Sequence, residues 1–275
     1  MDEDEWCSRL GAKLASVTRP LCERAALVPA GAASHQGFPI LVRRVPATQP
    51  PADREPMRIL LLGGIHGDEL TSVSIVFQWL DLIDSPQAAQ FHWHVAPVLN
   101  PDGLFSAKPQ RMNARGVDLN RNFPTPGWKE DAKDYWVKRA RRDPRRFPGE
   151  APLSEPESRW LHEEIERFRP DVVISVHAPF GILDFDGPKN PPRRFGRLYL
   201  NRLGVYPGSL GNYGGMHKNM PVITIELPNA TTMPPREEVE RIWRDMLAWL
   251  ERTAEGKASD EGKDEVVESE APPEH

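Results

Sequence analysis

The stretch that decides the fold is RILLLGGIHGDE, residues 58–69. Its apolar first half reads as a short buried strand, and residues 71–83 read as the helix behind it, which gives the strand–loop–helix unit of α/β proteins. The loop between them carries His66 and Glu69, three residues apart. A neutral imidazole and a carboxylate suit Zn²⁺, so the loop is a candidate metal site, although the same spacing also arises by chance in solvated loops.

A catalytic zinc site needs a third protein ligand, and His177 is the best candidate. It closes residues 171–176, an apolar run rich in β-branched residues that reads as a buried strand. Ligands at the ends of neighbouring strands converge on one edge of a sheet. The other histidines read as structural or solvated, because none has a partner at ligand spacing.

A polar segment, residues 111–124, looks built to hold an anion. It contains three arginines and three asparagines with little apolar content, and it follows a turn with the sequence NPDG at residues 100–103. Arg offers a planar fork of donors that matches a carboxylate, and Asn adds neutral donors beside it. The alternative is a polar surface loop.

In chain order the motifs are GGIHGDE, NPDG, GVDLNRNFP, a strand ending in His177 and a strand ending in Glu226. This ordered set resembles the M14 family of zinc carboxypeptidases over residues 31–250. The resemblance implies an α/β fold with a mixed, mostly parallel central sheet flanked by helices on both faces. It also implies one Zn²⁺ per chain, held by His66, Glu69 and His177.

The resemblance makes Glu226 the general acid/base of the reaction. The residues themselves support this role, because a carboxylate at the end of an apolar strand is costly unless it has a partner, such as a zinc-bound water. Arg111 matches the arginine that stabilises the oxyanion in the family. Asn120 and Arg121 match the pair that binds the terminal carboxylate of the substrate.

The chain departs from the family pattern in residues 204–213. Tyr206 is the closer match to the family's mobile active-site tyrosine, but its spacing is short, and Tyr213 competes for the role. Leu210 falls where the family lines its specificity pocket. An apolar residue there argues against a simple preference for basic side chains, although diaminopimelate could be recognised by other residues.

The resemblance predicts zinc-dependent hydrolysis of an amide bond next to a free terminal carboxylate. Within the family, residues 113–124 resemble the members that act on cell-wall peptides. That resemblance implies the γ-D-glutamyl-diaminopimelate bond of murein peptides as the target and a small peptide as the substrate. Two alternatives stay open. One is a zinc deacylase of N-acyl amino acids, which activity on a panel of substrates would distinguish from a peptidase. The other is a non-catalytic sensor of peptidoglycan fragments, and the presence of Glu226 argues against it.

With 275 residues and 39% hydrophobic content, the chain is long enough for one sizeable α/β domain. We predict an N-terminal helical segment over residues 1–30, a catalytic domain over 31–252 and a disordered acidic tail over 253–275. Further helices are predicted from Ser154, where a Ser-x-x-Glu spacing suggests a capping box, and over residues 236–252. The net charge of −5 lies mostly in the tail.

The N-terminus is acidic and shows no signal-peptide pattern, and no segment is long enough for a membrane helix, so we predict a cytoplasmic protein without a membrane partner. Cys7 and Cys22 are accordingly expected to be reduced thiols. The basic cluster at residues 138–146 has no interleaved aromatics and is read as a solvated face, not a nucleic-acid site. The sequence leaves the oligomeric state open.

Overall fold

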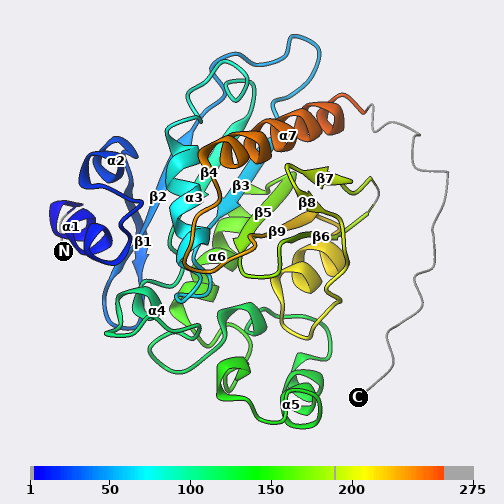
Figure 1. Cartoon of the computed structure of the whole chain (residues 1–275). Coiled ribbons are helices and arrows are strands. Elements are labelled where there is room, and N and C mark those ends of the chain that lie inside the picture. Colours follow the sequence, from blue (N-terminus) through cyan, green and yellow to red (C-terminus); the bar gives the residue numbers. More distant parts are fainter. Residues whose placement is uncertain (1–2, 189, 257–275) are drawn as a thin grey trace.

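The computed structural model describes residues 3–188 and 190–256, and its centre is a seven-stranded sheet with the order β1-β2-β4-β3-β5-β9-β6 (Figure 1). The four central strands, β4, β3, β5 and β9, run parallel, whereas β2, β1 and β6 pair antiparallel at the two sides. The fold is therefore α/β with a mixed sheet, as predicted. The strands are β1 Val28–Ala33, β2 Pro39–Val45, β3 Arg58–Leu62, β4 His92–Ala96, β5 Val172–His177, β6 Ile182–Asp186 and β9 Val222–Glu226.

The central strands form because their sequences suit burial on both faces. Every residue of β5 is buried, and the strand reads Val-Val-Ile-Ser-Val-His. Near-continuous β-branched runs are typical of parallel strands that are covered by helices on both sides. The sequence alone therefore predicted β3 and β5 well.

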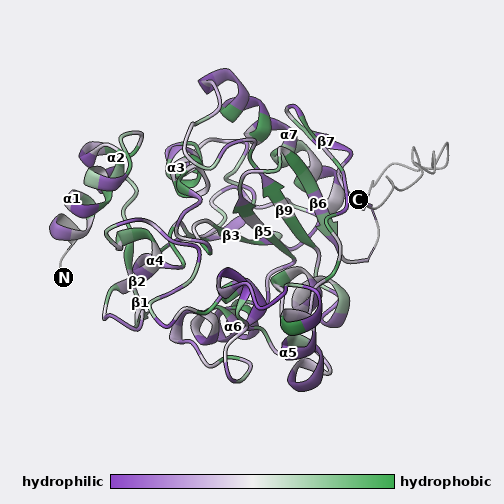
Figure 2. Cartoon of the chain, turned by 60° about the horizontal axis from the view of Figure 1, so that its bottom comes forward, coloured by the Kyte–Doolittle hydropathy of each residue, from purple (hydrophilic) through white to green (hydrophobic). Residues whose placement is uncertain are grey.

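Helices cover both faces of the sheet (Figure 2). On one face α3 (Leu70–Leu80) and α7 (Arg236–Ala254) pack with α1 (Glu3–Lys13) and α2 (Arg19–Arg24) into one hydrophobic cluster with alternate residues of the strands. On the other face α6 (Pro156–Phe168) packs into a second hydrophobic cluster. Its strand residues alternate along the strands with those of the first cluster. The other elements are α4 Pro101–Phe105, α5 Trp128–Lys138, β7 Arg194–Phe195, β8 Leu198–Tyr199, two 3₁₀ helices at Leu119–Arg121 and Pro144–Arg146, and a π-helix at Asn212–His217.

The start of α6 differs from the prediction. The helix begins at Pro156, and the Ser154 hydroxyl donates to the Glu155 carboxylate instead of capping the helix. The same hydroxyl accepts from the Asn122 side chain, so tertiary contacts compete with the predicted capping box. Proline in the first turn fixes the start of the helix without a side-chain cap.

Cys7 and Cys22 form a disulfide, which corrects the prediction of reduced thiols. The two cysteines are buried where α1 meets α2, with a Cα–Cα distance of 5.6 Å that lies within the range of disulfides. Sequence spacing gave no sign that the two helices would pack side by side. Trp6 and Leu10 of α1 belong to the same hydrophobic cluster as the sheet, so the predicted N-terminal segment packs on the rest of the chain.

The predicted tail, residues 253–275, lies for the most part outside the described residues, since α7 ends at Ala254 and the description stops at residue 256. In the described part of the chain, no helix combines the length and the apolar character that crossing a membrane requires.

Candidate metal centre and active-site cleft

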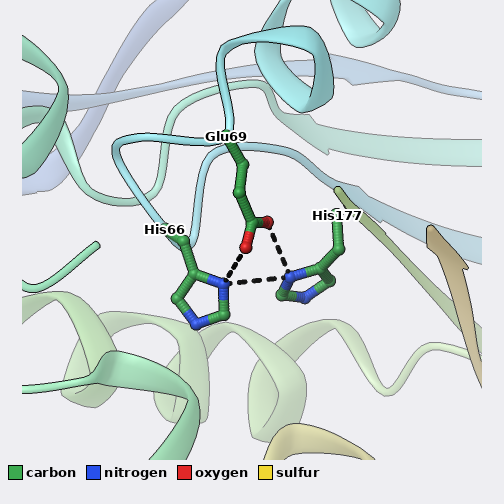
Figure 3. A group of neighbouring side chains, drawn as sticks. All are labelled: His66, Glu69 and His177. Atoms are coloured by element: carbon green, nitrogen blue, oxygen red, sulfur yellow. Dashed lines mark hydrogen bonds and ion pairs between the residues drawn. The ribbon is translucent and has the colours of Figure 1, made fainter. Parts of the chain in front are cut away.

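Three predicted ligands meet at the carboxyl edge of the sheet (Figure 3). His66 lies in the loop after β3, Glu69 precedes α3, and His177 ends β5, which pairs in parallel with β3. The Nδ1 atom of His66 lies 2.8 Å from Oε1 of Glu69 and 3.1 Å from Nδ1 of His177, and the latter lies 3.0 Å from Oε2 of Glu69. All three side chains are buried, and one ligand atom from each lies within 4.8 Å of the others.

Glycines let the loop after β3 take its tight path. Gly64 has a φ of +59°, in the left-handed region that favours glycine. A Cβ on Gly67 would overlap with the backbone of Gly103, because the His66 loop packs directly on α4. The two loops that the sequence marks, GGIHGDE and NPDG, therefore support each other.

Each of the two histidines has a hydrogen-bond partner at Nε2, which leaves Nδ1 to face a cation. Nε2 of His66 lies 3.1 Å from Oδ1 of Asp118, and Nε2 of His177 lies 3.1 Å from the Ser175 hydroxyl. A hydrogen bond donated by Nε2 of His66 to Asp118 leaves the lone pair on Nδ1. Two Nδ1 atoms and a carboxylate then face one point. Two nitrogens and one oxygen are the donor set of a catalytic zinc site, so the residues present fit the metal.

Charge within the cluster agrees with this arrangement. Burial works to raise the pKa of Glu69, but the facing His66 and His177 outweigh it, and the pKa of this carboxyl falls below its usual range. The pKa of Asp118 is lowered in the same way, since the Arg111 guanidinium and His66 outweigh its complete burial. Both groups are therefore carboxylates at neutral pH.

Asp118 is a site residue that the sequence reasoning missed. Its Oδ2 accepts from Nε and Nη2 of Arg111 at 3.0 and 2.9 Å, and its Oδ1 accepts from the backbone N–H of Asn120 at 3.0 Å as well as facing His66. One buried carboxylate thus orients a metal ligand, an arginine and the Asn120 loop. The signal in the sequence was a lone acid between the arginines of residues 111–121.

Arg111 lies beside the metal cluster. Its Nη1 lies 3.1 Å from Nδ1 of His66 and 3.4 Å from Oε1 of Glu69. The Asp118 carboxylate holds the other side of the guanidinium. The group can therefore donate toward the point at which a substrate oxygen would meet the cluster.

Glu226 ends β9, directly opposite His177 in the parallel pairing of β5 and β9. Its side chain is buried, and Oε2 accepts from the backbone N–H of Phe180 at 3.4 Å. Burial raises the pKa of Glu226, and the nearby Glu69 adds to the rise. A carboxyl with a raised pKa beside a metal cluster is suited to general acid/base chemistry.

Arg121 and Asn120 line the same cleft, which has a volume of ≈ 380 Å³. Arg121 is 8% exposed, and burial lowers the pKa of its guanidinium. Its Nη1 donates to the Asn120 carbonyl at 2.6 Å, whereas its buried Nε has no hydrogen-bond partner among the residues that the structure describes. An unsatisfied buried donor in a cleft is suited to an anionic ligand.

The structure distinguishes between the two tyrosines that the sequence leaves as candidates for the mobile active-site tyrosine. Tyr206 lines the cleft, with the guanidinium of Arg121 4.5 Å from its ring centre and its hydroxyl donating to the Leu203 carbonyl at 2.7 Å. Tyr213 is buried away from the cleft, with its hydroxyl 2.5 Å from Nδ1 of His162. Tyr206 alone of the two is placed to meet a substrate.

Leu210 does not line the cleft, which corrects the expectation for the specificity pocket. Its side chain is 2% exposed and lies in the hydrophobic cluster on the α6 face of the sheet. Only its backbone is near the site, where the N–H donates to Oδ1 of Asn120 at 2.8 Å. That part of the cleft is lined instead by Gly211, Thr224 and two acids of β6, Asp184 and Asp186.

The sequence matches the family described as zinc carboxypeptidase over residues 20–180. The chain belongs to the zinc carboxypeptidase family. It is therefore a metal-dependent hydrolase, and zinc is the metal that the cluster of His66, Glu69 and His177 would hold.

Similar proteins include murein peptide amidase A of Escherichia coli K12, which is 34% identical over 251 residues, covering 87% of this chain and 98% of that protein. The crystal structure of murein-tripeptide amidase from E. coli O157 aligns with a TM-score of 0.54 and 30% identity, covering 84% of this chain and 94% of that one. Carboxypeptidase A from Helicoverpa armigera aligns with a TM-score of 0.66 at 18% identity, covering 88% and 73%, and shows the shared fold.

The cleft of this zinc carboxypeptidase also contains part of the basic cluster that was read as a solvated face. Arg145 and Arg146 line it, and Nη2 of Arg145 lies 2.9 Å from Oδ2 of Asp68. Both arginines are about half exposed, so the prediction of a solvated face holds for their outer sides. Folding brings this segment to the metal centre, which its sequence position did not indicate.

Proposed function

We propose that this zinc carboxypeptidase hydrolyses the γ-D-glutamyl-diaminopimelate bond of murein peptides and releases diaminopimelate. The observation that carries the proposal is the 34% identity to murein peptide amidase A, which extends over 98% of that protein. The intact cluster of His66, Glu69 and His177 beside Glu226 supports a catalytic protein over a sensor of peptidoglycan fragments.

Each site residue has a place in this reaction. His66, Glu69 and His177 would hold zinc, which when bound would supply a Lewis acid and lower the pKa of a water. Glu226 accepts a proton from the attacking water and passes it to the leaving amine, a role for which its raised pKa suits it. Arg111, held by Asp118, donates to the oxygen on which negative charge develops.

Arg121 and Asn120 bind the terminal carboxylate of the residue that leaves. The unpartnered Nε of Arg121 and its burial support this role, because a charge-assisted bond gains strength in a site shielded from water. Tyr206 covers the guanidinium from one side. The amide bond to be cleaved would then lie between this anion site and the metal centre.

The experiment is product analysis after incubation of the zinc-loaded protein with L-Ala-γ-D-Glu-meso-diaminopimelate. We expect release of free diaminopimelate and L-Ala-D-Glu. Glu226→Gln keeps the size of the side chain but cannot accept the proton, so turnover should fall ~10²–10⁴-fold with zinc content unchanged. Release of N-terminal alanine, or an intact tripeptide beside rapid cleavage of N-acyl amino acids, would contradict the proposal and favour a deacylase or another peptidase.

We further propose a role in peptidoglycan recycling in the cytoplasm. The similarity to murein peptide amidase A supports the first part. The Cys7–Cys22 disulfide weighs against the second, because disulfides persist mainly in oxidising compartments. Cell fractionation with immediate thiol alkylation tests the location, since a cytoplasmic protein is expected to yield both cysteines in alkylated form.

A further inference from the structure

Two of the three asparagines in the polar segment, residues 111–124, point away from the cleft. Asn113 and Asn122 are both 0% exposed, and of the three only Asn120 lines the cleft. The amides of Asn113 and Asn122 therefore cannot donate to a substrate anion, which the sequence suggested for the whole segment. A buried amide has two donors and an acceptor oxygen to satisfy within the protein, so its partners show what it does.

Asn113 closes a turn between Arg111 and Asp118. Its Oδ1 accepts from the backbone N–H groups of Arg115 and Val117 at 3.0 and 3.1 Å, and its own backbone N–H donates to the Val117 carbonyl at 3.0 Å. Asp118 is the next residue in the chain. The turn therefore fixes how far Arg111 lies from the carboxylate that holds its guanidinium.

The other side of the same amide attaches this turn to the start of α6. Nδ2 of Asn113 donates to Oε2 of Glu155 at 2.8 Å and to Oε2 of Glu157 at 3.2 Å. Both acids are at most 1% exposed, and a buried acid is costly without a donor. Because α6 packs on the sheet through the second hydrophobic cluster, Asn113 connects the turn beside Arg111 to a fixed part of the core.

Asn122 makes the corresponding attachment next to Arg121. Its Oδ1 accepts from the Ser158 hydroxyl of α6 at 2.6 Å and from the backbone N–H of Glu155 at 3.3 Å. Its Nδ2 donates to two backbone carbonyls within residues 148–151 at 2.8 and 2.9 Å. The start of α6 therefore holds both ends of the segment that carries the two arginines.

The two arginines have different tasks in the proposed reaction. Arg111 donates to an oxygen on which charge develops only in the transition state, so a displaced Arg111 lowers kcat. Arg121 binds a carboxylate that is present in the substrate and in the transition state, so a displaced Arg121 raises KM. A change at one end of the segment should therefore differ in its kinetic effect from a change at the other end.

We propose that Asn113 and Asn122 are positioning residues of the active site, with Asn113 placing Arg111 for the transition state and Asn122 placing Arg121 for the terminal carboxylate. This inference rests on the proposed function in that the two arginines must have the roles given there. Neither asparagine touches the substrate, and each acts through the backbone that it attaches to α6.

The test is the kinetics of Asn113→Asp and Asn122→Asp on L-Ala-γ-D-Glu-meso-diaminopimelate. Each substitution keeps the size and the Oδ1 acceptor of the side chain and removes its NH₂ donor. We expect Asn113→Asp to lower kcat by ~10–100-fold with little change in KM. We expect Asn122→Asp to raise KM by ~10-fold with a smaller change in kcat.

Glu155→Gln provides a rescue of Asn113→Asp. Oε1 of Glu155 accepts from the Ser154 hydroxyl, so a glutamine that keeps this contact presents its NH₂ group to residue 113. The double variant reverses donor and acceptor and should recover most of kcat, whereas Glu155→Gln alone should lower it. Glu164→Gln is the matched control, because it changes another buried acid of α6, one that faces His94, and should lower stability without changing kcat or KM.

Thermal unfolding shows whether each variant is folded. If Asn113→Asp does not fold, Glu155→Gln tests the placement of Arg111, since it removes the same bond from the other side. The inference would be overturned if the Asn113 and Asn122 variants changed kcat and KM alike. It would also be overturned if the double variant regained stability without regaining kcat, because Asn113 would then only stabilise the fold.

A second peptide separates this inference from the proposed function. If the wild type does not cleave the tripeptide, the murein activity is refuted, and the same variants are compared on hippuryl-L-lysine, which has an α-peptide bond and a free terminal carboxylate. Calorimetry with the zinc-free proteins measures binding of this peptide without cleavage. Asn122→Asp should weaken that binding ~10-fold and Asn113→Asp should not. Equal affinity in the wild type and Asn122→Asp would show that Asn122 does not place Arg121.

Discussion

Asp118→Asn is the substitution that best tests how the site is held together. The wild-type carboxylate is fully buried and serves three groups: His66 and the Asn120 N–H through Oδ1, and Arg111 through Oδ2. An asparagine that keeps its oxygen toward His66 must turn its NH₂ group toward Arg111. Donors would then face donors at the two bonds that now measure 2.9 and 3.0 Å.

The size of the effect follows from these contacts. Loss of an outer partner of a metal-binding histidine typically lowers metal affinity 10–100-fold, or about 1.4–2.8 kcal/mol. We expect the lower end for Asp118→Asn, which keeps an acceptor for His66, and the upper end for Asp118→Ala, which does not. Removing one partner of a buried ion pair costs about 3–5 kcal/mol of stability, and the lower value applies because Arg111 keeps Glu69 at 3.4 Å.

Zinc affinity is measured by competition with a chelator, and stability by urea unfolding of the zinc-free proteins. Asp102→Asn is the matched control: Asp102 is also buried, but it accepts from Ser34 and from the Gln36 N–H, away from the metal cluster. It should lower stability without changing zinc affinity. Wild-type zinc affinity in Asp118→Ala would refute the reasoning, since His66 would then need no partner at Nε2.

Three further predictions concern single side chains. His177→Ala should lose most of the zinc that the wild type holds at about one per chain, and metal analysis that finds full occupancy would exclude His177 as a ligand. Arg121→Ala should lower kcat/KM on substrates with a free terminal carboxylate by ~10²-fold or more and have little effect on their amidated counterparts, whereas an equal loss on both would indicate a structural role. Burial raises the pKa of Glu157 to about 7, above its value in an unfolded chain. Between these two pKa values the folded state holds a proton that the unfolded state releases. The free energy of unfolding should therefore fall by at most about 3 kcal/mol as pH rises from 4.5 to 7. Urea unfolding at pH 5 and pH 8 measures this, and Glu157→Gln, which resembles the protonated form, should make the difference smaller by the share that Glu157 contributes, since Glu226 and Asp186 also have raised pKa values.

The gathering of these residues at one edge could be predicted from sequence because His177 and Glu226 end recognisable apolar strands, and His66 and Glu69 lie in the loop that follows another. Parallel neighbours end at one edge, so His66, His177 and Glu226 had to meet once β3, β5 and β9 were adjacent. The approximate bounds of these strands followed from their composition. The order of the motifs along the chain then indicated one type of site, a zinc carboxypeptidase site.

The remaining parts of the site depend on contacts between segments with no local signature. Asp118 is identified only by the three groups around it, and Leu210 turned away from the cleft because packing on the α6 face decides which side of the loop is buried. Asp184 and Asp186 also line the cleft and belong to no motif that would have marked them in the sequence. The disulfide required knowledge that α1 and α2 lie side by side, which two cysteines at a separation of 15 residues did not supply.

The pairing of β3 with β5 has a consequence for synthesis of the chain on the ribosome. Leu62 pairs with Ser175, so the strand that leads to His66 acquires its second partner, β5, only after more than half of the chain has been made, although β4 is available earlier. All three residues of the candidate metal cluster exist once residue 177 has emerged, but Glu226, the proposed base on β9, follows only later. A nascent chain can therefore gain the capacity to hold metal before it can gain the capacity to cleave an amide, and arrested chains ending between these two points would separate the two events.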